Sequence, residues 1–229
     1  MTRAASLSRC LSLQRTRRVG LGPLPALALV LLVLTTVDVL LFGGRHAGDQ
    51  SVFSDGLPAR TGIGHTVWRT VVMGGQYWLI GTAAALATAW AAWRARSVRL
   101  LVCGGLWLVA TELIIRTMQL ALGRTPPLDG VDELFSGAAS FPSGHAANAA
   151  ACLTFIPAIL AASRRLQVVA HGWALLVAVA VVTLGYHWPT DAVAGWSLGI
   201  VLAWLGLRIV FRVERPRPAV RPVRPPSSG

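Results

Sequence analysis

The chain has 229 residues, of which 54% are hydrophobic and only 13% are charged. This balance excludes an ordinary water-soluble domain, in which roughly a quarter of the residues are charged. The net charge is +12, all 21 basic residues are arginines, and most of these flank apolar runs. We therefore expect the charge to face an anionic membrane surface and not a nucleic acid.

Six apolar stretches are long enough, or nearly so, to cross about 30 Å of hydrocarbon, which takes roughly 20 helical residues. They are residues 21–42, 72–93, 100–122, 146–162, 168–185 and 191–210. The pattern predicts an all-α, integral membrane six-helix bundle. We expect residues 21–211 to form this single domain, after a basic segment, residues 1–20, and before a disordered tail rich in Arg and Pro, residues 212–229.

The arginines also predict the orientation, because short cytoplasmic loops carry an excess of basic residues. They concentrate before the first stretch, after the second, after the fourth and after the sixth. Both termini are therefore expected in the cytoplasm, and the loops before the fourth and sixth stretches outside. The first stretch is expected to remain as a helix, because its apolar core is longer than that of a signal peptide.

The loop before the fourth stretch contains the sequence Pro142-Ser143-Gly144-His145. Ser143 stands where a helix N-cap belongs, so the free amides of the following residues would point outward. Such a helix start binds phosphate, because unpaired N–H groups and the positive end of the helix dipole converge on it. The alternative interpretation is a plain N-cap followed by an interfacial His.

A second candidate element, GYHWPTD, precedes the sixth stretch. Pro189 suits the first turn of a helix. Asp191 follows His187 by four residues, a spacing that can bring the carboxylate back to the imidazole, fix its tautomer and stabilise the imidazolium. The alternative role of Asp191 is a favourable charge at the helix N-terminus. Both elements are expected on the outer face.

Together these residues resemble the type 2 phosphatidic acid phosphatase superfamily, membrane lipid phosphatases related in fold to bacterial acid phosphatases and vanadium haloperoxidases. The family pattern is Lys, six residues, Arg-Pro; then Pro-Ser-Gly-His; then Ser-Arg, five residues, His, three residues, Asp. The likeness spans residues 100–210 and includes the whole second motif. It implies a phosphohistidine mechanism in which His187 attacks phosphorus, Asp191 orients it and His145 protonates the leaving oxygen, with no metal or cofactor.

The other two motifs depart from the family pattern. In the third motif, Ala180 and Val181 occupy the positions of the family's Ser and Arg. In the first motif, Gln119 stands at the Lys position and Pro126 at the Arg position. Charge-assisted hydrogen bonds contribute about 1.5 to 3 kcal/mol each, so the missing basic residues need replacements.

Arg116 and Arg124 are the candidate replacements. Arg116 lies one turn before Gln119, and an Arg inside a membrane helix is a candidate functional residue by default. Its alternative role is neutralisation of Glu112, four residues earlier, and the alternative role of Arg124 is that of an interfacial anchor. The predicted substrate-binding residues are Arg116, Gln119, Arg124, Ser143 and Gly144.

Two further expectations concern the surroundings of this site. Asp129, Asp132 and Glu133 in the outer loop are expected to face water, because inward carboxylates would repel an anion. Gly195 and Gly199 form a GxxxG pattern, which indicates close helix packing or, less favoured, dimerisation.

The sequence as a whole therefore predicts a membrane phosphatase that hydrolyses a prenyl or glycerophospholipid phosphate or diphosphate at the extracytoplasmic interface. The alternative is a weak or inactive relative that binds or moves a phosphorylated lipid, because basic residues of the motifs are missing. A haloperoxidase is not expected, since vanadate needs the same basic residues. No metal site is expected at the remaining histidines, which have no Cys or Glu at ligand spacing. The lipid and the oligomeric state are left open.

Overall fold

The computed structural model describes residues 22–43 and 47–213. The predicted basic segment, residues 1–20, and nearly all of the predicted tail lie outside these ranges. Within them, the regular structure is helical throughout, which confirms the all-α prediction.

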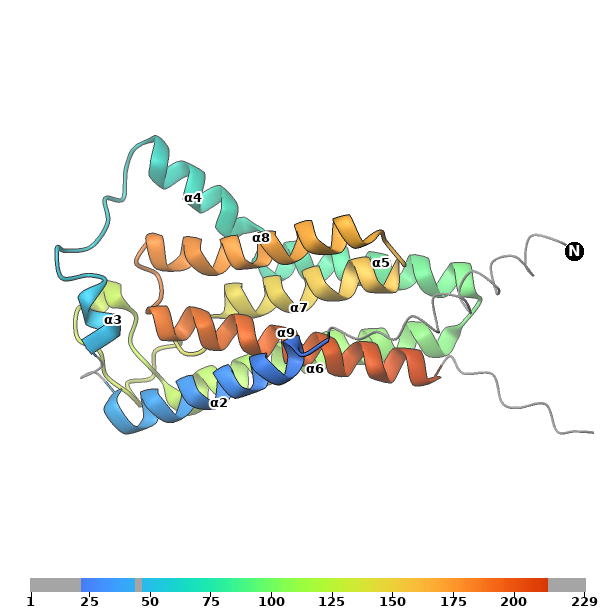
Figure 1. The fold of residues 1–229 in the computed structure, drawn as a ribbon, viewed down its shortest axis with the longest axis horizontal. Helices are drawn as coiled ribbons and strands as arrows, with labels where there is room; N and C mark the ends of the chain where they lie inside the picture. The colour runs from blue at the N-terminus through green and yellow to red at the C-terminus, as the bar shows by residue number, and fades with distance from the viewer. Residues whose placement is uncertain (1–21, 44–46, 214–229) are drawn as a thin grey trace, which may run out of the picture.

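Six long helices lie side by side along the length of the molecule (Figure 1). They are α2 (Leu24–Phe42), α5 (Tyr77–Ala95), α6 (Val98–Leu122), α7 (Gly144–Ile159), α8 (Arg164–Thr183) and α9 (Pro189–Val213). The short helices α3 (Ala47–Ser51) and α4 (Ile63–Met73) and the 3₁₀ turn η2 (Pro127–Asp129) lie in the connections at one end.

Each predicted apolar stretch corresponds to one long helix. In the described part of the chain, α2, α6, α8 and α9 are long and apolar enough to cross a membrane, and α7 is a shorter apolar helix. Six membrane spans therefore remain a prediction, while six bundled helices are observed.

The second predicted stretch, residues 72–93, is wrong at its start. Helix α4 ends at Met73 and α5 begins at Tyr77, with Gly74 and Gly75 in the break. A Cβ at Gly75 would lie 2.4 Å from the carbonyl oxygen of His145. The backbone of the break packs directly against the first turn of α7, beside a predicted catalytic residue. No side chain fits between them, so the position requires glycine.

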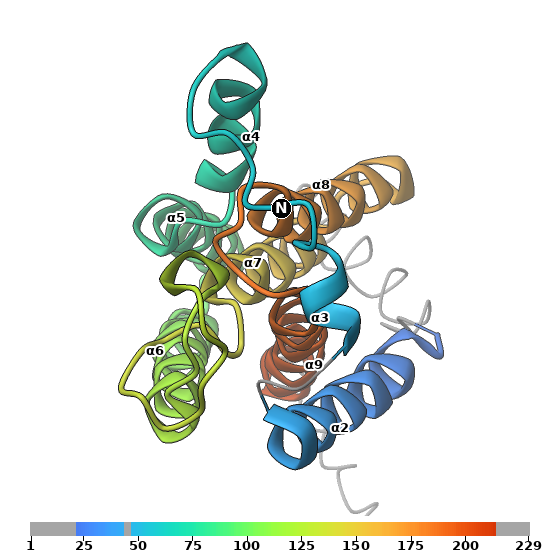
Figure 2. The ribbon, with the colours of Figure 1, turned by 90° about the vertical axis from the view of Figure 1, so that its left-hand side faces the viewer.

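Helix α7 occupies the centre of the bundle and packs against α5, α8 and α9 (Figure 2). Its first half is rich in alanine, and these small side chains are fully buried. Small residues let neighbouring backbones approach closely, which is how membrane helices pack.

The GxxxG pattern of α9 provides such a close approach within the chain. A Cβ at Gly195 would lie 2.4 Å from the carbonyl oxygen of Ser143, and one at Gly199 would lie 2.3 Å from that of Ala147. The prediction of close helix packing is therefore confirmed. It holds together the starts of the two helices that bear the predicted catalytic residues.

Gly195→Ala is expected to destabilise the protein by about 1 to 3 kcal/mol, because an added methyl group must displace the backbone of α7. The midpoint of thermal unfolding in detergent micelles measures this effect. Gly105→Ala is the matched control, since a Cβ at Gly105 on α6 meets no atom within 4 Å. An equal midpoint for both variants would contradict the packing argument.

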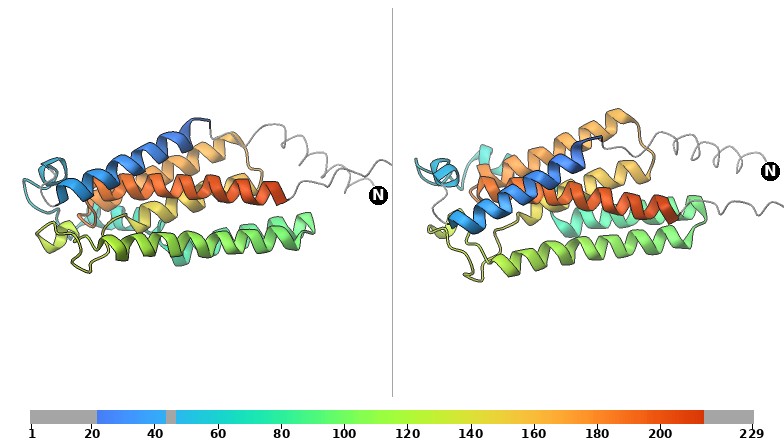
Figure 3. Two further views of the ribbon diagram at one scale, coloured as in Figure 1. Left: turned by 90° about the horizontal axis from the view of Figure 1, so that it is seen from below. Right: turned by 60° about the horizontal axis from the view of Figure 1, so that its bottom comes forward.

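The two ends of the bundle differ in charge. The α5–α6 and α7–α8 connections and the end of α9 lie at one end, opposite α3 and the starts of α7 and α9 (Figures 1 and 3). Described arginines at that end are Arg94, Arg96, Arg99, Arg164, Arg165 and Arg212. The positive-inside rule predicts that this end is cytoplasmic.

Candidate active site

The start of α7 has the geometry predicted for it. Ser143 is the N-cap, and its Oγ accepts a hydrogen bond from the amide of Ala146 at 3.4 Å. The Ser143 amide donates to the backbone oxygen of Asp191 at 3.0 Å, which joins the starts of α7 and α9. The amides of Gly144 and His145 belong to the first turn and therefore lack an intrahelical acceptor. They are suited to bind an anion.

His187 lies directly before α9 and is 8% exposed. Its Nδ1 is 2.9 Å from the backbone oxygen of Ser140. A carbonyl oxygen can only accept, so Nδ1 carries the hydrogen and the lone pair of the neutral ring lies on Nε2. Nε2 is therefore the nitrogen able to act as a nucleophile.

Asp191 is fully buried, but it does not bond directly to His187. Its Oδ2 lies 3.7 Å from the imidazole Nδ1, beyond hydrogen-bond distance. Ser140 stands between them: its Oγ donates to Asp191 Oδ2 at 2.5 Å and lies 3.3 Å from His187 Nδ1. The prediction of a direct Asp–His contact is therefore corrected to an indirect one. The sequence predicted no role for Ser140. Its position two residues before the Pro142-Ser143-Gly144-His145 motif was the only feature that pointed to the site.

His145 faces His187 across the site, with ring centroids 6.4 Å apart and planes at 64°. The structure thus brings together side chains from the two predicted elements at a separation that one phosphoryl group can bridge. His145 stands in the first turn, ahead of the apolar run that begins at Ala146. Burial, followed by the neighbouring charges of His187 and Arg116, lowers the pKa of His145 to about 4. Its imidazole is therefore neutral at pH 7 until an anion arrives.

Arg116 makes the contact with Glu112 that was considered as its alternative role. Its Nε donates to Glu112 Oε1 at 3.1 Å and its Nη1 to Gln119 Oε1 at 3.2 Å, while the side chain remains 63% exposed. These bonds engage two of the five guanidinium N–H groups. The charge of the guanidinium acts on the imidazole of His145, and its role in binding phosphate stays a prediction.

Gln119, at the position of the family's Lys, is buried within the same network. Its Nε2 donates to the carbonyl oxygen of Pro142 at 3.0 Å while its Oε1 accepts from Arg116. One amide hydrogen of Gln119 remains, so its expected role in binding substrate stays a prediction. Gln119 links Arg116 to the loop that precedes α7.

Arg124 is fully buried, and each of its five N–H groups points at an acceptor. Nε and Nη2 donate to Asp132, Nη2 also to Asp49, and Nη1 to Thr190 and Asp191. No N–H group remains for phosphate, so the expected phosphate-binding role of Arg124 disagrees with the structure.

The charges around Arg124 explain this outcome. Burial lowers the pKa of Arg124, but the hydrogen bond with Asp132 and the charge of Asp191 more than offset it and raise the pKa above its usual value. The expectation that Asp132 faces water is wrong, because its side chain is buried against the guanidinium. Asp129 and Glu133 are exposed as predicted.

The positions aligned with the family's Ser-Arg pair are Ala180 and Val181. Both are fully buried among apolar side chains of α8 and its neighbours. These two positions therefore supply no cation, and Arg116 stays a predicted replacement for the missing basic residues.

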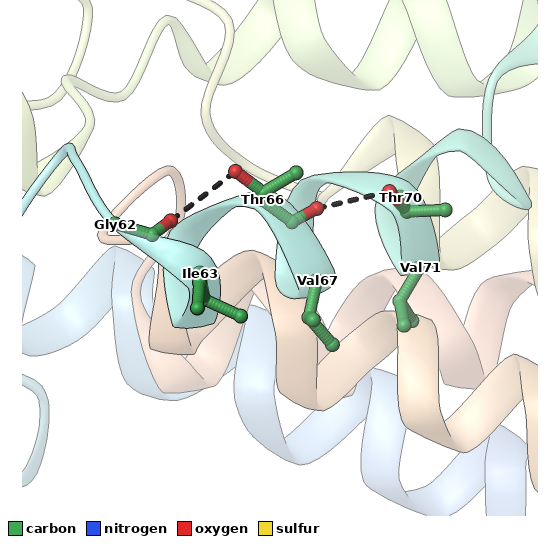
Figure 4. A pocket seen from close by; sticks show the side chains of 6 residues that line it. All are labelled: Gly62, Ile63, Thr66, Val67, Thr70 and Val71. Atoms are coloured by element: carbon green, nitrogen blue, oxygen red, sulfur yellow. Dashed lines mark hydrogen bonds between the residues drawn. The ribbon is translucent and has the colours of Figure 1, made fainter.

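A cavity of about 620 Å³ lies elsewhere, along α4 (Figure 4). It is lined by Gly62, Ile63, Thr66, Val67, Thr70 and Val71. Thr66 and Thr70 bond to carbonyl oxygens of their own helix. None of the predicted site residues lines this cavity, so it is separate from the histidine pair.

Comparison with known proteins agrees with these observations. Residues 118–215 match the model of the PAP2 superfamily. A stretch of 74 residues is 36% identical to phosphatidylglycerophosphatase B of Bacillus subtilis (strain 168), and this match covers 29% of the chain and 36% of that protein. The match thus spans little more than a third of the curated relative's length.

The fold is similar to that of a solved structure, the transmembrane PAP2 type phosphatidylglycerolphosphate phosphatase from Bacillus subtilis. The TM-score is 0.67 at 20% sequence identity, over 85% of this chain and all of that one. At this identity the likeness shows the fold. Together with the long apolar helices, it identifies an integral membrane protein.

Proposed function

Because the chain belongs to the PAP2 superfamily, we propose that it is a membrane phosphatase that hydrolyses a phosphate or diphosphate on a prenyl lipid or glycerophospholipid. One observation carries this proposal: the rings of His145 and His187 face each other, and the lone pair of His187 lies on Nε2. A fixed imidazole nucleophile opposite a second imidazole is the arrangement that covalent phosphoryl transfer needs.

The proposed reaction has two steps. Nε2 of His187 attacks phosphorus, the bond from phosphorus to the lipid oxygen breaks, and His145 gives a proton to that oxygen. Water then attacks phosphorus, the bond from phosphorus to Nε2 of His187 breaks, His145 takes up a proton from the water, and inorganic phosphate leaves. The negative charge of the bound phosphate raises the pKa of His145, so the general acid forms only in the complex.

The phosphate oxygens are held by the amides of Gly144 and His145 together with the Arg116 guanidinium. These groups are fixed before the substrate arrives, and charge develops on the equatorial oxygens they would contact. The site lies at the end of the bundle opposite the arginine-rich connections. We therefore place it at the extracytoplasmic interface, with the lipid tail beside the apolar helices.

Arg116→Gln is expected to lower kcat/KM for a lipid phosphate by about 10- to 100-fold, since a charge-assisted hydrogen bond contributes about 1.5 to 3 kcal/mol. Phosphate release from phosphatidylglycerol phosphate, phosphatidic acid and prenyl diphosphates in mixed micelles, without added metal, measures this loss and identifies the lipid. Arg94→Gln, at the far end of the bundle, serves as the control. Equal rates for the two variants would remove Arg116 from the site.

A second candidate function is a weak or inactive relative that binds or moves a phosphorylated lipid. It is favoured by the complete engagement of Arg124 and by the burial of Ala180 and Val181, which leave few cations beside the histidines. Tight binding of a lipid phosphate to purified protein without turnover would support this candidate over the enzyme.

A further inference from the structure

Arg124 is the centre of a buried group of charges that the proposed reaction does not use. We call Arg124, Asp49, Asp132 and Thr190 the Arg124 cluster. Arg124 Nη2 lies 2.7 Å from Asp49 Oδ2, Nε lies 2.8 Å from Asp132 Oδ1, and Nη1 lies 2.7 Å from Thr190 Oγ1. Asp49 comes from α3 and Thr190 from α9. Arg124 and Asp132 both lie in the connection between α6 and α7.

The cluster is tied to the start of α9 at two points. Asp49 Oδ1 accepts the amide hydrogen of Thr190 at 3.0 Å, so a carboxylate from α3 caps the helix. Arg124 Nη1 donates to Asp191 Oδ1 at 2.8 Å. The other oxygen of that carboxylate, Oδ2, accepts from Ser140 and from the amide of Trp188.

The cluster also fixes the group that holds the nucleophile. The amide of Ser140 donates to the backbone oxygen of Arg124 at 3.0 Å. Ser140 in turn presents its own carbonyl oxygen to Nδ1 of His187. Arg124 therefore acts on the imidazole along two routes, through its side chain and Asp191, and through its main chain and Ser140.

Stability alone is a weak explanation for this arrangement. Desolvation of buried charges costs about as much as their attraction returns, so buried ion pairs often add little to folding. Here three carboxylates surround a single guanidinium, which leaves the cluster and Asp191 with an excess of negative charge. That excess lies beside His187, the ring that becomes phosphorylated in the proposed reaction.

We propose that Arg124, Asp49 and Asp132 are positioning residues for the nucleophile: they fix Asp191 and Ser140, and so hold His187 in the tautomer with its lone pair on Nε2. This rests on the proposed function for its kinetic consequence, but the tautomer itself is independent of any activity. The residues act through others and do not touch the substrate.

The test compares Asp132→Asn with Asp129→Asn. The two residues lie three positions apart in one loop and undergo the same change of charge, but only Asp132 is buried against Arg124. Asp132→Asn is expected to lower kcat at least about tenfold with KM changed less than about threefold, because a small misplacement of a reacting group is costly. Asp129→Asn is expected to match the parent protein.

A spectroscopic readout separates positioning from folding. Protein labelled with ¹⁵N in its histidines, with His187 assigned from a His187→Gln variant, should show one tautomer with Nδ1 protonated. In Asp132→Asn the His187 signals should shift toward a mixture of tautomers. Asp49→Asn is the second variant, used if Asp132→Asn does not fold, and the same shift is expected.

Combined variants test the route. In a Ser140→Ala background, which removes the Oγ of the side-chain route and keeps the main-chain route, adding Asp132→Asn should lower kcat by at least about threefold less than it does in the parent protein, because residues that act through one another are not additive. A fully additive loss, or an unchanged His187 tautomer with only a lower unfolding temperature, would overturn the inference. A parent protein without phosphatase activity would instead reject the proposed function, and the tautomer measurement would still decide the inference.

Discussion

Replacement of His187 by Ala is expected to lower kcat for lipid phosphate hydrolysis by a factor of about 10⁴ or more, because removal of a covalent nucleophile leaves only binding and electrostatic effects. The imidazole is held by Ser140 on its Nδ1 side, which leaves the Nε2 lone pair for attack at phosphorus. Phosphate release by purified protein in mixed micelles measures the loss.

Two comparisons sharpen this result. His65→Ala on α4 removes an imidazole outside the histidine pair and should retain the parent rate. The unfolding temperature of His187→Ala should stay close to that of the parent protein, since the ring makes few bonds beyond that to Ser140. Hydrolysis at the parent rate in the variant would exclude a phosphohistidine at this position.

Asp191→Asn is expected to lower kcat by about 10³- to 10⁴-fold, as replacement of the orienting carboxylate does in related arrangements. The carboxylate accepts on both oxygens, from Arg124 on Oδ1 and from Ser140 and Trp188 on Oδ2. An amide offers one acceptor, so its NH₂ group must face a donor on one side or the other. Either orientation disturbs the contact between Ser140 and His187.

The measurement for this variant is kcat together with the unfolding temperature. A large loss of kcat in a protein that unfolds near the parent temperature is the expected outcome. A loss smaller than tenfold in folded protein would show that Ser140 holds the imidazole without help from Asp191.

Much of the fold could be predicted from composition and spacing. Long apolar runs bounded by arginines predict helices and their ends, because hydrocarbon thickness sets the length and loop charge sets the boundaries. The cap at Ser143 was predictable because it depends on local chemistry. The break between α4 and α5 was not, since Gly74 and Gly75 are needed there only because another helix approaches.

The site was predictable where its residues act locally and unpredictable where they act at long range. His145, His187 and Asp191 belong to short patterns, and the structure brings them to one place. Arg124 was predicted to bind phosphate because its carboxylate partners could not be recognised from the sequence. Two of them, Asp49 and Asp191, are distant in the sequence, and Asp132 lies in a loop where a carboxylate is expected to be exposed. Asp49 lies 141 positions from Thr190, a separation at which no sequence pattern indicates a contact.

The most direct test of the account is the isolation of the phosphorylated intermediate. Protein mixed with a lipid phosphate and quenched within milliseconds should carry one acid-labile phosphoryl group on the peptide that contains His187, and the His187→Ala variant should carry none. Steady hydrolysis of the lipid with no phosphoryl group on that peptide at any quench time would contradict the central claim.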